Sequence, residues 1–155
     1  MRWPFGSQGK RPIFLCHGCF DLLHVGHLEH LMEVRHLASK VNGLVYVTVT
    51  SDACVNKGPG RPLLPAEERA ELLRMLRCVD RAEVIDASTA VLAIERFKPL
   101  WYCKGLDYQG QEHSDPQLVA EIAAVRKHGG ELLVTSSGVR HSTDYLARHL
   151  NANRC

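Results

Sequence analysis

The chain has 155 residues, of which 45% are hydrophobic and 23% charged, a composition typical of one compact α/β-sized domain. This composition excludes collagen, disordered and coiled-coil proteins. Nineteen Lys and Arg against seventeen Asp and Glu leave a formal net charge of +2. This charge is too small for the dense basic surface of a nucleic-acid-binding protein. We therefore expect no nucleic-acid partner, and any bound anion must be held by a few placed groups.

Targeting signals are not apparent in the sequence. The first dozen residues include basic side chains but no apolar stretch of signal-peptide length. No later segment approaches the ~18 apolar residues that a membrane-spanning helix needs. We expect no membrane partner and a cytoplasmic protein whose six cysteines stay reduced.

Short apolar runs and amphipathic segments alternate along the chain. The runs are rich in β-branched residues, as in LVYVTVT, and are typical of buried strands. Five strands are expected, at Ile13 to Cys16, Leu44 to Thr50, Ala82 to Ile85, Trp101 to Cys103 and Leu132 to Thr135.

The segments between these strands have apolar residues at every third or fourth position, which is typical of helices packed on one face. Pro65 suits a first helical turn, and Gly129-Gly130 suits a helix end. Asp86 or Ser88 is expected to cap one helix, and Ser114 or Asp115 another. The four expected apolar faces are Leu28/Leu31/Met32/Leu37, Leu72/Leu73/Leu76, Val91/Leu92/Ile94 and Val119/Ile122/Val125.

This alternation predicts an α/β fold, a Rossmann-like three-layer sandwich with a five-stranded parallel sheet. We expect a loose leader over residues 1–12 and a single domain over residues 13–155. Ligands of such sheets bind beyond the carboxyl ends of the strands, where the strand order reverses. The loops after Cys16, Thr50, Cys103 and Thr135 are therefore the places to expect a site.

The first of these loops contains His24-Val-Gly26-His27 at the start of a predicted helix. Free backbone N–H groups and the positive end of the helix dipole favour an anion there. Two imidazoles could donate to the same phosphate oxygens, and Gly26 allows a triphosphate to approach the backbone. The loop is neither a Walker loop nor a dinucleotide-binding GxGxxG turn.

Four segments together resemble the cytidylyltransferase-like nucleotidyltransferases. GCFDLLHVGH is similar to the family signature GxFDxxHxGH. The remaining segments look most like the heptose 1-phosphate adenylyltransferase domain of ADP-heptose synthase, and the resemblance covers roughly residues 13–150. These segments are SDACVNKGPGRPLLPAEERAELLRML, CKGLDY and HGGELLVTSSGVRHSTDYL.

The resemblance implies a role for each matching residue. His24, His27 and Lys57 would be catalytic, and Lys57, Arg61 and Arg69 would bind the acceptor substrate. The nucleotide would be bound by Cys19, Phe20 and Gly26 at the triphosphate, by Lys104, Gly105 and Asp107 at the base and ribose, and by Ser142 and Thr143 at the phosphates.

The implied reaction is transfer of a nucleoside monophosphate from an NTP, with ATP favoured, to a phosphorylated small molecule such as a heptose-type sugar 1-phosphate. Pyrophosphate is released, and Mg²⁺ arrives with the NTP while the protein itself holds no metal. The alternative is a CTP-dependent enzyme acting on glycerol 3-phosphate or a similar alcohol phosphate. The resemblance suggests a homodimer, and Leu106 and His141 depart from the family motifs on the nucleotide-facing loops.

Other interpretations stay open. His24, His27 and His30 could form a zinc site, and Cys16-His-Gly-Cys19 could be a redox motif. A nucleotide-binding regulatory module could keep the fold without turnover. The individual assignments have simpler alternatives: a flexible loop at Lys57, a helix-surface ion pair at Arg69, a helix cap at Ser142 and Thr143, and surface or boundary positions at His30 and His36.

Overall fold

The fold is built around one parallel β-sheet. A computed structural model describes residues 10–138, 144 and 146–148. The sheet has five strands in the order β3-β2-β1-β4-β5, all parallel, which confirms the predicted fold class. The strands are β1 (Ile13–Gly18), β2 (Leu44–Thr50), β3 (Arg81–Ile85), β4 (Trp101–Lys104) and β5 (Glu131–Val134).

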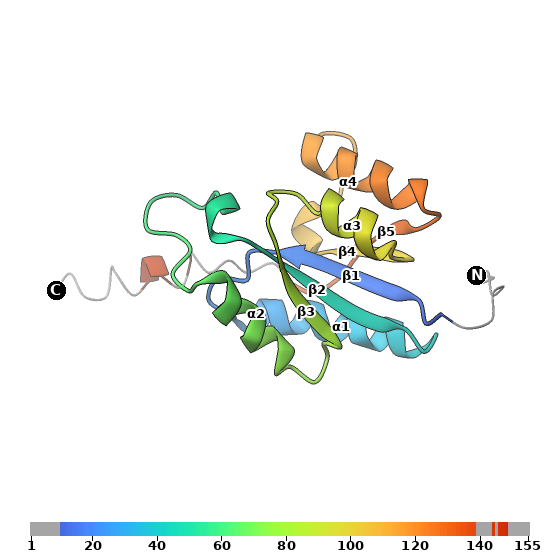
Figure 1. Ribbon diagram of the computed structural model, residues 1–155, viewed down its shortest axis with the longest axis horizontal. Coiled ribbons are helices and arrows are strands. Elements are labelled where there is room, and N and C mark those ends of the chain that lie inside the picture. The colour runs from blue at the N-terminus through green and yellow to red at the C-terminus, as the bar shows by residue number, and fades with distance from the viewer. Residues whose placement is uncertain (1–9, 139–143, 145, 149–155) are drawn as a thin grey trace.

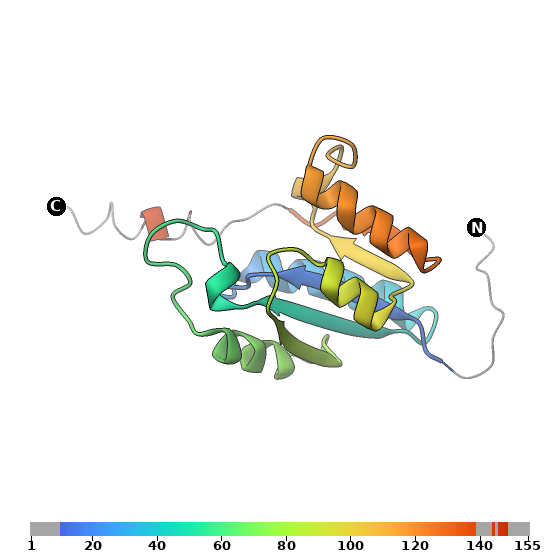
Figure 2. The same ribbon diagram turned by 45° about the horizontal axis from the view of Figure 1, so that its top comes forward.

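Helices cover both faces of this sheet (Figure 1). One face carries α1 and α2, and the other carries α3 and α4, so the chain forms three layers (Figures 1 and 2). The helices are α1 (Val25–Ser39), α2 (Ala66–Arg74), α3 (Val91–Phe97) and α4 (Pro116–Lys127), with short 3₁₀ turns η1 (Asp52–Cys54) and η2 (Leu106–Tyr108).

Two apolar clusters separate the layers. The cluster on the α1 and α2 side includes Phe14, Leu31 and Val47, and the cluster on the α3 and α4 side includes Leu15 and Ile94. Neighbouring residues of β1 thus enter opposite layers, as the pleat of a doubly covered strand requires. Each predicted helix face nevertheless includes one exposed member: Met32, Leu72, Leu92 and Val119.

The predicted caps are confirmed at one helix and wrong at another. Asp115 caps α4 by accepting from the backbone N–H groups of Gln117 and Leu118. Neither Asp86 nor Ser88 caps α3, because Ala90 is its N-cap residue and has no capping side chain. The buried carboxylate of Glu121 accepts from the Ala90 N–H at 2.9 Å instead, so a neighbouring helix supplies the missing acceptor.

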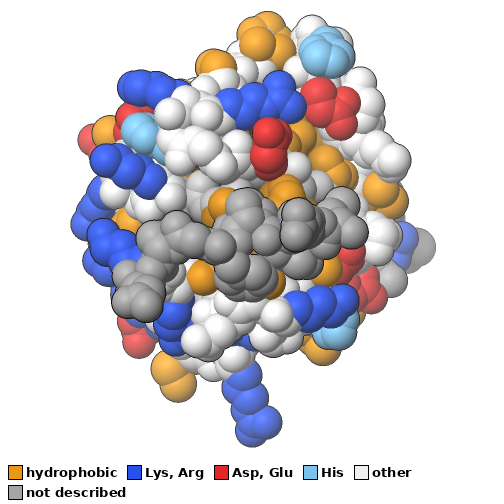
Figure 3. Space-filling model, turned by 90° about the vertical axis from the view of Figure 1, so that its right-hand side faces the viewer, with side chains coloured by type: hydrophobic (Ala, Val, Ile, Leu, Met, Phe, Trp, Pro, Cys, Tyr) orange, Lys and Arg blue, Asp and Glu red, His pale blue; other side chains and the backbone are white. Residues whose placement is uncertain are grey.

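Charges of both signs mix at the amino ends of the strands, the end that faces the viewer in Figure 3. Arg35 pairs there with Asp80, and Arg126 pairs with Glu131. Arg11 donates to the carbonyl oxygens of Asn42 and Gly43, so the described chain is anchored before β1 begins. No helix within residues 10–138 is long and apolar enough to cross a membrane.

Candidate active site

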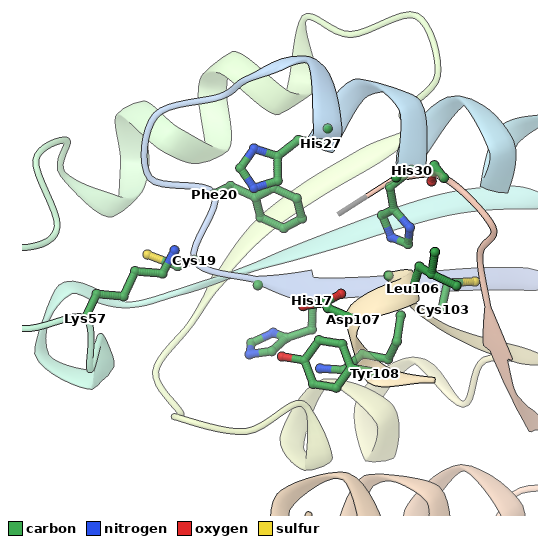
Figure 4. Close-up of a pocket in the computed structure, with 16 residues that line it drawn as sticks. His17, Cys19, Phe20, His27, His30, Lys57, Cys103, Leu106, Asp107 and Tyr108 are labelled. Carbon is green, nitrogen blue, oxygen red and sulfur yellow. The ribbon is translucent and has the colours of Figure 1, made fainter. Parts of the chain in front are cut away.

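A cavity of about 350 Å³ opens at the carboxyl ends of β1 and β4. These two strands flank the point where the strand order reverses, which is where open α/β sheets bind ligands. Figure 4 shows Lys57 at one end of the cavity, His27 and Phe20 above it, and His30, Cys103 and Leu106 at the other end. The predicted nucleotide-binding residues Cys19, Phe20, Gly26, Lys104, Gly105 and Asp107 all line it.

His24 and His27 cap the N-terminus of α1. His24 is the N-cap residue and its Nδ1 accepts from the Gly26 N–H at 3.2 Å, while Nδ1 of His27 accepts from the His24 N–H at 3.4 Å. Because each Nδ1 is an acceptor, the proton of each neutral ring is on Nε2. The cap therefore fixes both imidazoles as Nε2–H donors beside the helix N-terminus.

The two rings also stack, with centroids 3.9 Å apart. His27 lines the cavity, but His24 does not, so His24 supports the ring of its neighbour. The Phe20 ring also contacts His27, with the two ring centroids 5.2 Å apart. The pair predicted from the sequence is thus together, with unequal access to the cavity.

The loop between β1 and α1 has an uncommon backbone. Phe20 and Leu22 have φ values of 51° and 63°, in the left-handed region that bulky residues rarely adopt. Asp21 between them is fully buried and accepts from the backbone N–H groups of Leu63 and Leu64. This buried carboxylate holds the strained loop in place below the cavity.

Arg61 completes the Asp21 anchor. Its Nε donates to the Asp21 carboxylate at 2.5 Å, and its side chain is only 6% exposed. Burial acts to raise the pKa of Asp21, but the hydrogen bonds from Leu63, Arg61 and Leu64 lower it below its usual value. Arg61 does not line the cavity, so its assignment to the acceptor stays a prediction.

The assignment of Arg69 to the acceptor is wrong for this geometry. Its side chain is fully buried, and the guanidinium donates to the carbonyl oxygens of Leu64, Cys19 and Thr50. Its ion pair with Asp52 at 2.6 Å is not a helix-surface pair either. Arg69 ties the ends of β1 and β2 to α2, and so positions the loop at Cys19 rather than contacting a ligand.

Lys57 is the exposed cation of the site. It lies in the loop after η1, lines the cavity and points toward the Cys19 side of it (Figure 4). Exposure lets its ammonium group meet a phosphate that enters from solvent. The structure therefore brings Lys57 and His27 to one cavity, as the sequence suggests.

Lys104 is a buried cation on the opposite wall. Its Nζ lies 3.6 Å from the Glu121 carboxylate and 3.9 Å from the centroid of the Tyr108 ring. The same Glu121 accepts from the Tyr102 hydroxyl at 2.8 Å, so a buried acidic side chain fixes Lys104 from behind. Glu121 was not predicted, since a lone Glu on a helix gives no signal that it points inward.

The turn after Lys104 brings a carboxylate to the cavity. A Cβ added at Gly105 would lie 2.6 Å from the Asp107 carboxylate, so a larger residue there would displace this side chain. Asp107 is exposed and is the only carboxylate among the described lining residues. Leu106, which replaces a glycine of the family motif, lines the cavity as well.

His30 is partly buried, within the surface or boundary position expected for it, but it also lines the cavity, which was not expected. Its Nδ1 lies 2.8 Å from the Thr135 hydroxyl. Burial acts to lower the pKa of His30, but the nearby Cys16, Glu33 and Asp107 raise it above its usual value. The spacing of three from His27 places both rings along one helix face, and this signal could have identified His30. His36 is exposed, as expected.

Glu33 fixes the last wall of the cavity. Its carboxylate accepts from the backbone N–H groups of Ser136 and Ser137 and from the Ser136 hydroxyl. Burial acts to raise the pKa of Glu33, but these hydrogen bonds lower it overall. Ser137 and Gly138 line the cavity as a result, whereas Ser142, Thr143 and His141 lie outside the described residues.

His17 at the end of β1 is a second histidine that sequence reasoning missed. Its Nδ1 lies 2.8 Å from the Thr48 hydroxyl, and its Nε2 lies 3.3 Å from the Thr50 hydroxyl. Burial, with a smaller effect of Lys104, lowers its pKa to about 4. His17 is therefore a neutral residue of the cavity wall at physiological pH.

The metal and redox alternatives receive different outcomes. Among the described residues no group of three or more His, Cys, Asp or Glu side chains could hold a metal ion, so the zinc interpretation has no support. Cys16 pairs in register with Cys103 rather than with Cys19, whose sulfur lies 3.8 Å from Arg69. The predicted Cys16 and Cys19 redox motif is thus not the pair that the sheet brings together.

The parallel sheet, the imidazole-capped helix and the cation-lined cavity define a nucleotide-binding α/β protein of the nucleotidyltransferase class. A family profile described as Cytidylyltransferase-like matches residues 15–138. The chain belongs to the cytidylyltransferase-like family, as its motifs indicate.

Curated relatives match nearly the whole chain. It is 35% identical over 147 residues to the bifunctional protein HldE of Syntrophotalea carbinolica, covering 93% of this chain. It is 37% identical over 149 residues to the bifunctional protein HldE of Geobacter sulfurreducens, covering 94% of this chain. The chain spans 28% of the length of each of these two relatives.

A solved structure shares the fold. The lipopolysaccharide core biosynthesis protein of Thermoplasma volcanium aligns with a TM-score of 0.67 and 22% identity. The alignment covers 84% of this chain and all of that one.

Proposed function

We propose that the chain transfers the AMP group of ATP to a sugar 1-phosphate of the heptose type and releases pyrophosphate. The observation that carries this proposal is that His27, Gly26 and Lys57 line one cavity together with Lys104 and Asp107. Such a cavity has donors and cations for phosphates and room for a nucleoside.

The reaction needs positioning and charge neutralisation more than a protein base. An anionic oxygen of the acceptor phosphate attacks the α-phosphorus in line, a new P–O bond forms, and the bond to the pyrophosphate oxygen breaks. The Nε2–H group of His27 would stabilise negative charge on the transferring phosphate, together with the N-terminus of α1, and the stacked His24 ring would hold His27 in position for catalysis. Lys57 would neutralise the acceptor phosphate and the departing pyrophosphate.

Mg²⁺ would accompany the triphosphate and neutralise its oxygens. The described part of the cavity offers one carboxylate, Asp107, and no group of side chains that could hold a resident metal. This donor set fits a metal that is ligated mainly by the nucleotide. A homodimer stays a prediction from the family resemblance.

The nucleoside end of the cavity would lie between the turn after β4 and the loop after β5. Lys104, Gly105 and Asp107 line one side of it, and Ser137 and Gly138 the other. The preference for ATP rests on the resemblance of CKGLDY to the adenylyltransferase domain of ADP-heptose synthase. The match to a Cytidylyltransferase-like profile favours, as the second candidate, a CTP-dependent enzyme acting on glycerol 3-phosphate or a similar alcohol phosphate.

A pyrophosphate-release assay that crosses four nucleotides with several phosphorylated acceptors tests this proposal. We expect the largest signal with ATP and a heptose 1-phosphate. A signal with CTP and glycerol 3-phosphate would support the second candidate. No signal with any pair, while nucleotide still binds, would favour the regulatory module.

A further inference from the structure

Two cysteines lie side by side on neighbouring strands, and one of them, Cys103, lines the cavity. Cys16 on β1 and Cys103 on β4 are direct register partners on neighbouring parallel strands. Both are 1% exposed and belong to the apolar cluster on the α1 side of the sheet, so their side chains leave the sheet on the same face. Adjacent strands lie about 4.8 Å apart, which is within the Cα separation of 4.4–6.8 Å found for disulfides.

His30 approaches the same pair from α1. It interacts with the Cys16 sulfur closely enough for each group to shift the pKa of the other, while the Cys103 sulfur donates to the Trp101 carbonyl oxygen at 3.9 Å. Cys103, together with His30 and Lys104, lowers the pKa of Cys16 to about 6 despite its burial. Burial and the neighbouring Cys16 raise the pKa of Cys103, so Cys16 is the more acidic thiol of the pair.

The geometry points to an oxidation site: we propose that Cys16 and Cys103 form a reversible disulfide beside the nucleotide cavity, with a small peroxide as the oxidant. His30 and Cys103 line the cavity, so a peroxide reaches the pair by the route that the nucleotide uses. Nucleotidyl transfer as derived above needs neither sulfur. The chemistry of the pair is therefore separate from the proposed reaction.

The oxidation proceeds in two balanced steps. The Cys16 thiolate attacks one peroxide oxygen, the O–O bond breaks, and the other oxygen leaves as water after taking up a proton, which forms a sulfenic acid. The Cys103 sulfur then attacks the Cys16 sulfur, loses its proton, and displaces the hydroxyl group as a second water. Two thiols are oxidised by two electrons and one peroxide is reduced.

The disulfide would change the charge and the lining of the cavity as well as the two sulfurs. Cys16 would lose the negative charge that faces His30, and with it one of the groups that raise the pKa of that imidazole. Cys103 would be drawn toward β1, away from the cavity that it lines. We expect weaker nucleotide binding by the oxidised protein, restored by reduction with dithiothreitol.

The test is a thiol map of the full chain after hydrogen peroxide treatment. The protein is denatured, its remaining thiols are alkylated, and the peptides are identified by mass spectrometry. We expect a Cys16–Cys103 linkage, a loss of these two thiols in each chain, and their recovery after dithiothreitol. Cys54→Ser is the matched control, because this cysteine lies in η1 outside the cavity and its loss should leave the linkage unchanged.

A second variant tests whether Cys103 is the partner of Cys16. Cys103→Ser removes the partner thiol, so Cys16 should pass from sulfenic to sulfinic acid instead of forming a disulfide. A map that joins Cys16 to Cys19, or that leaves Cys16 and Cys103 alkylatable after other cysteines have reacted, would overturn the proposal.

Protection by nucleotide connects the site to the cavity and, like the expected loss of nucleotide binding, rests on the proposed function. Saturating ATP with Mg²⁺ should slow formation of the linkage. A linkage that forms at the same rate with and without nucleotide would contradict the shared route, and it would leave the thiol map itself as evidence for the pair.

Discussion

His24 and His27 are joined at the start of α1 by a ring stack at 3.9 Å and by a reciprocal cap in which each Nδ1 accepts a backbone N–H. One feature of the fold thus begins the helix and sets the tautomer of both rings. Stability and catalysis are coupled in these residues, so variants are needed that separate the two.

His24→Asn and His24→Ala make that separation. Asn is a good N-cap residue, so His24→Asn should keep the cap while losing the ring that stacks on His27. We expect kcat to fall about 10²–10³-fold in both variants, because the His27 donor loses the ring that holds it in place. Only His24→Ala should also lose about 1 kcal/mol of unfolding free energy, measured by urea titration. Wild-type turnover in His24→Asn would show that the ring is only a cap.

The buried Lys104 and Glu121 pair predicts non-additive stability. Glu121→Gln leaves Lys104 without its carboxylate and should destabilise the fold by about 3–5 kcal/mol, the range for breaking a buried ion pair. Lys104→Met should cost a similar amount by leaving Glu121 unpaired. The double variant should recover part of this loss in urea unfolding, whereas additive effects would mean that the two charges do not interact.

Arg69 and Lys57 form a matched contrast between a buried and an exposed cation. Arg69→Met should lower the unfolding free energy by about 3–5 kcal/mol, because three carbonyl oxygens lose their donor. The protein that stays folded should keep its KM for the acceptor. Lys57→Met should leave the unfolding free energy nearly unchanged and raise that KM. A raised acceptor KM in folded Arg69→Met would restore the ligand role rejected above.

His17 predicts a pH dependence of stability. Its folded pKa of about 4 lies below the unfolded value of 6.5, so the unfolded chain binds the proton more readily between these values. Stability should therefore fall as the pH drops from about 6.5 to about 4, by on the order of 3 kcal/mol from this group. His17→Asn, which cannot titrate there, should flatten the profile measured by denaturation at successive pH values. An unchanged slope would contradict a neutral buried His17.

The sequence is most informative where a local pattern carries the physics. Runs such as LVYVTVT predicted the strands, and the His-x-Gly-His spacing at a helix start indicated a segment whose Gly26 and His27 line the cavity. Arg69 was misassigned because its burial arises from the packing of α2 on two distant strand ends, which no local pattern records. Glu121 and His17 act through partners far away in the chain, and only the folded sheet brings Glu121 behind Lys104 and His17 to the cavity wall.

Transfer of label from [α-³²P]ATP tests the central claim most directly. The protein is incubated with Mg²⁺, the labelled ATP and a heptose 1-phosphate, and the products are separated and identified by mass. We expect label in an ADP-sugar, an equal amount of pyrophosphate, and loss of both in His27→Ala. Label that stays in ATP, or that appears only in free AMP or ADP, would contradict nucleotidyl transfer to this acceptor.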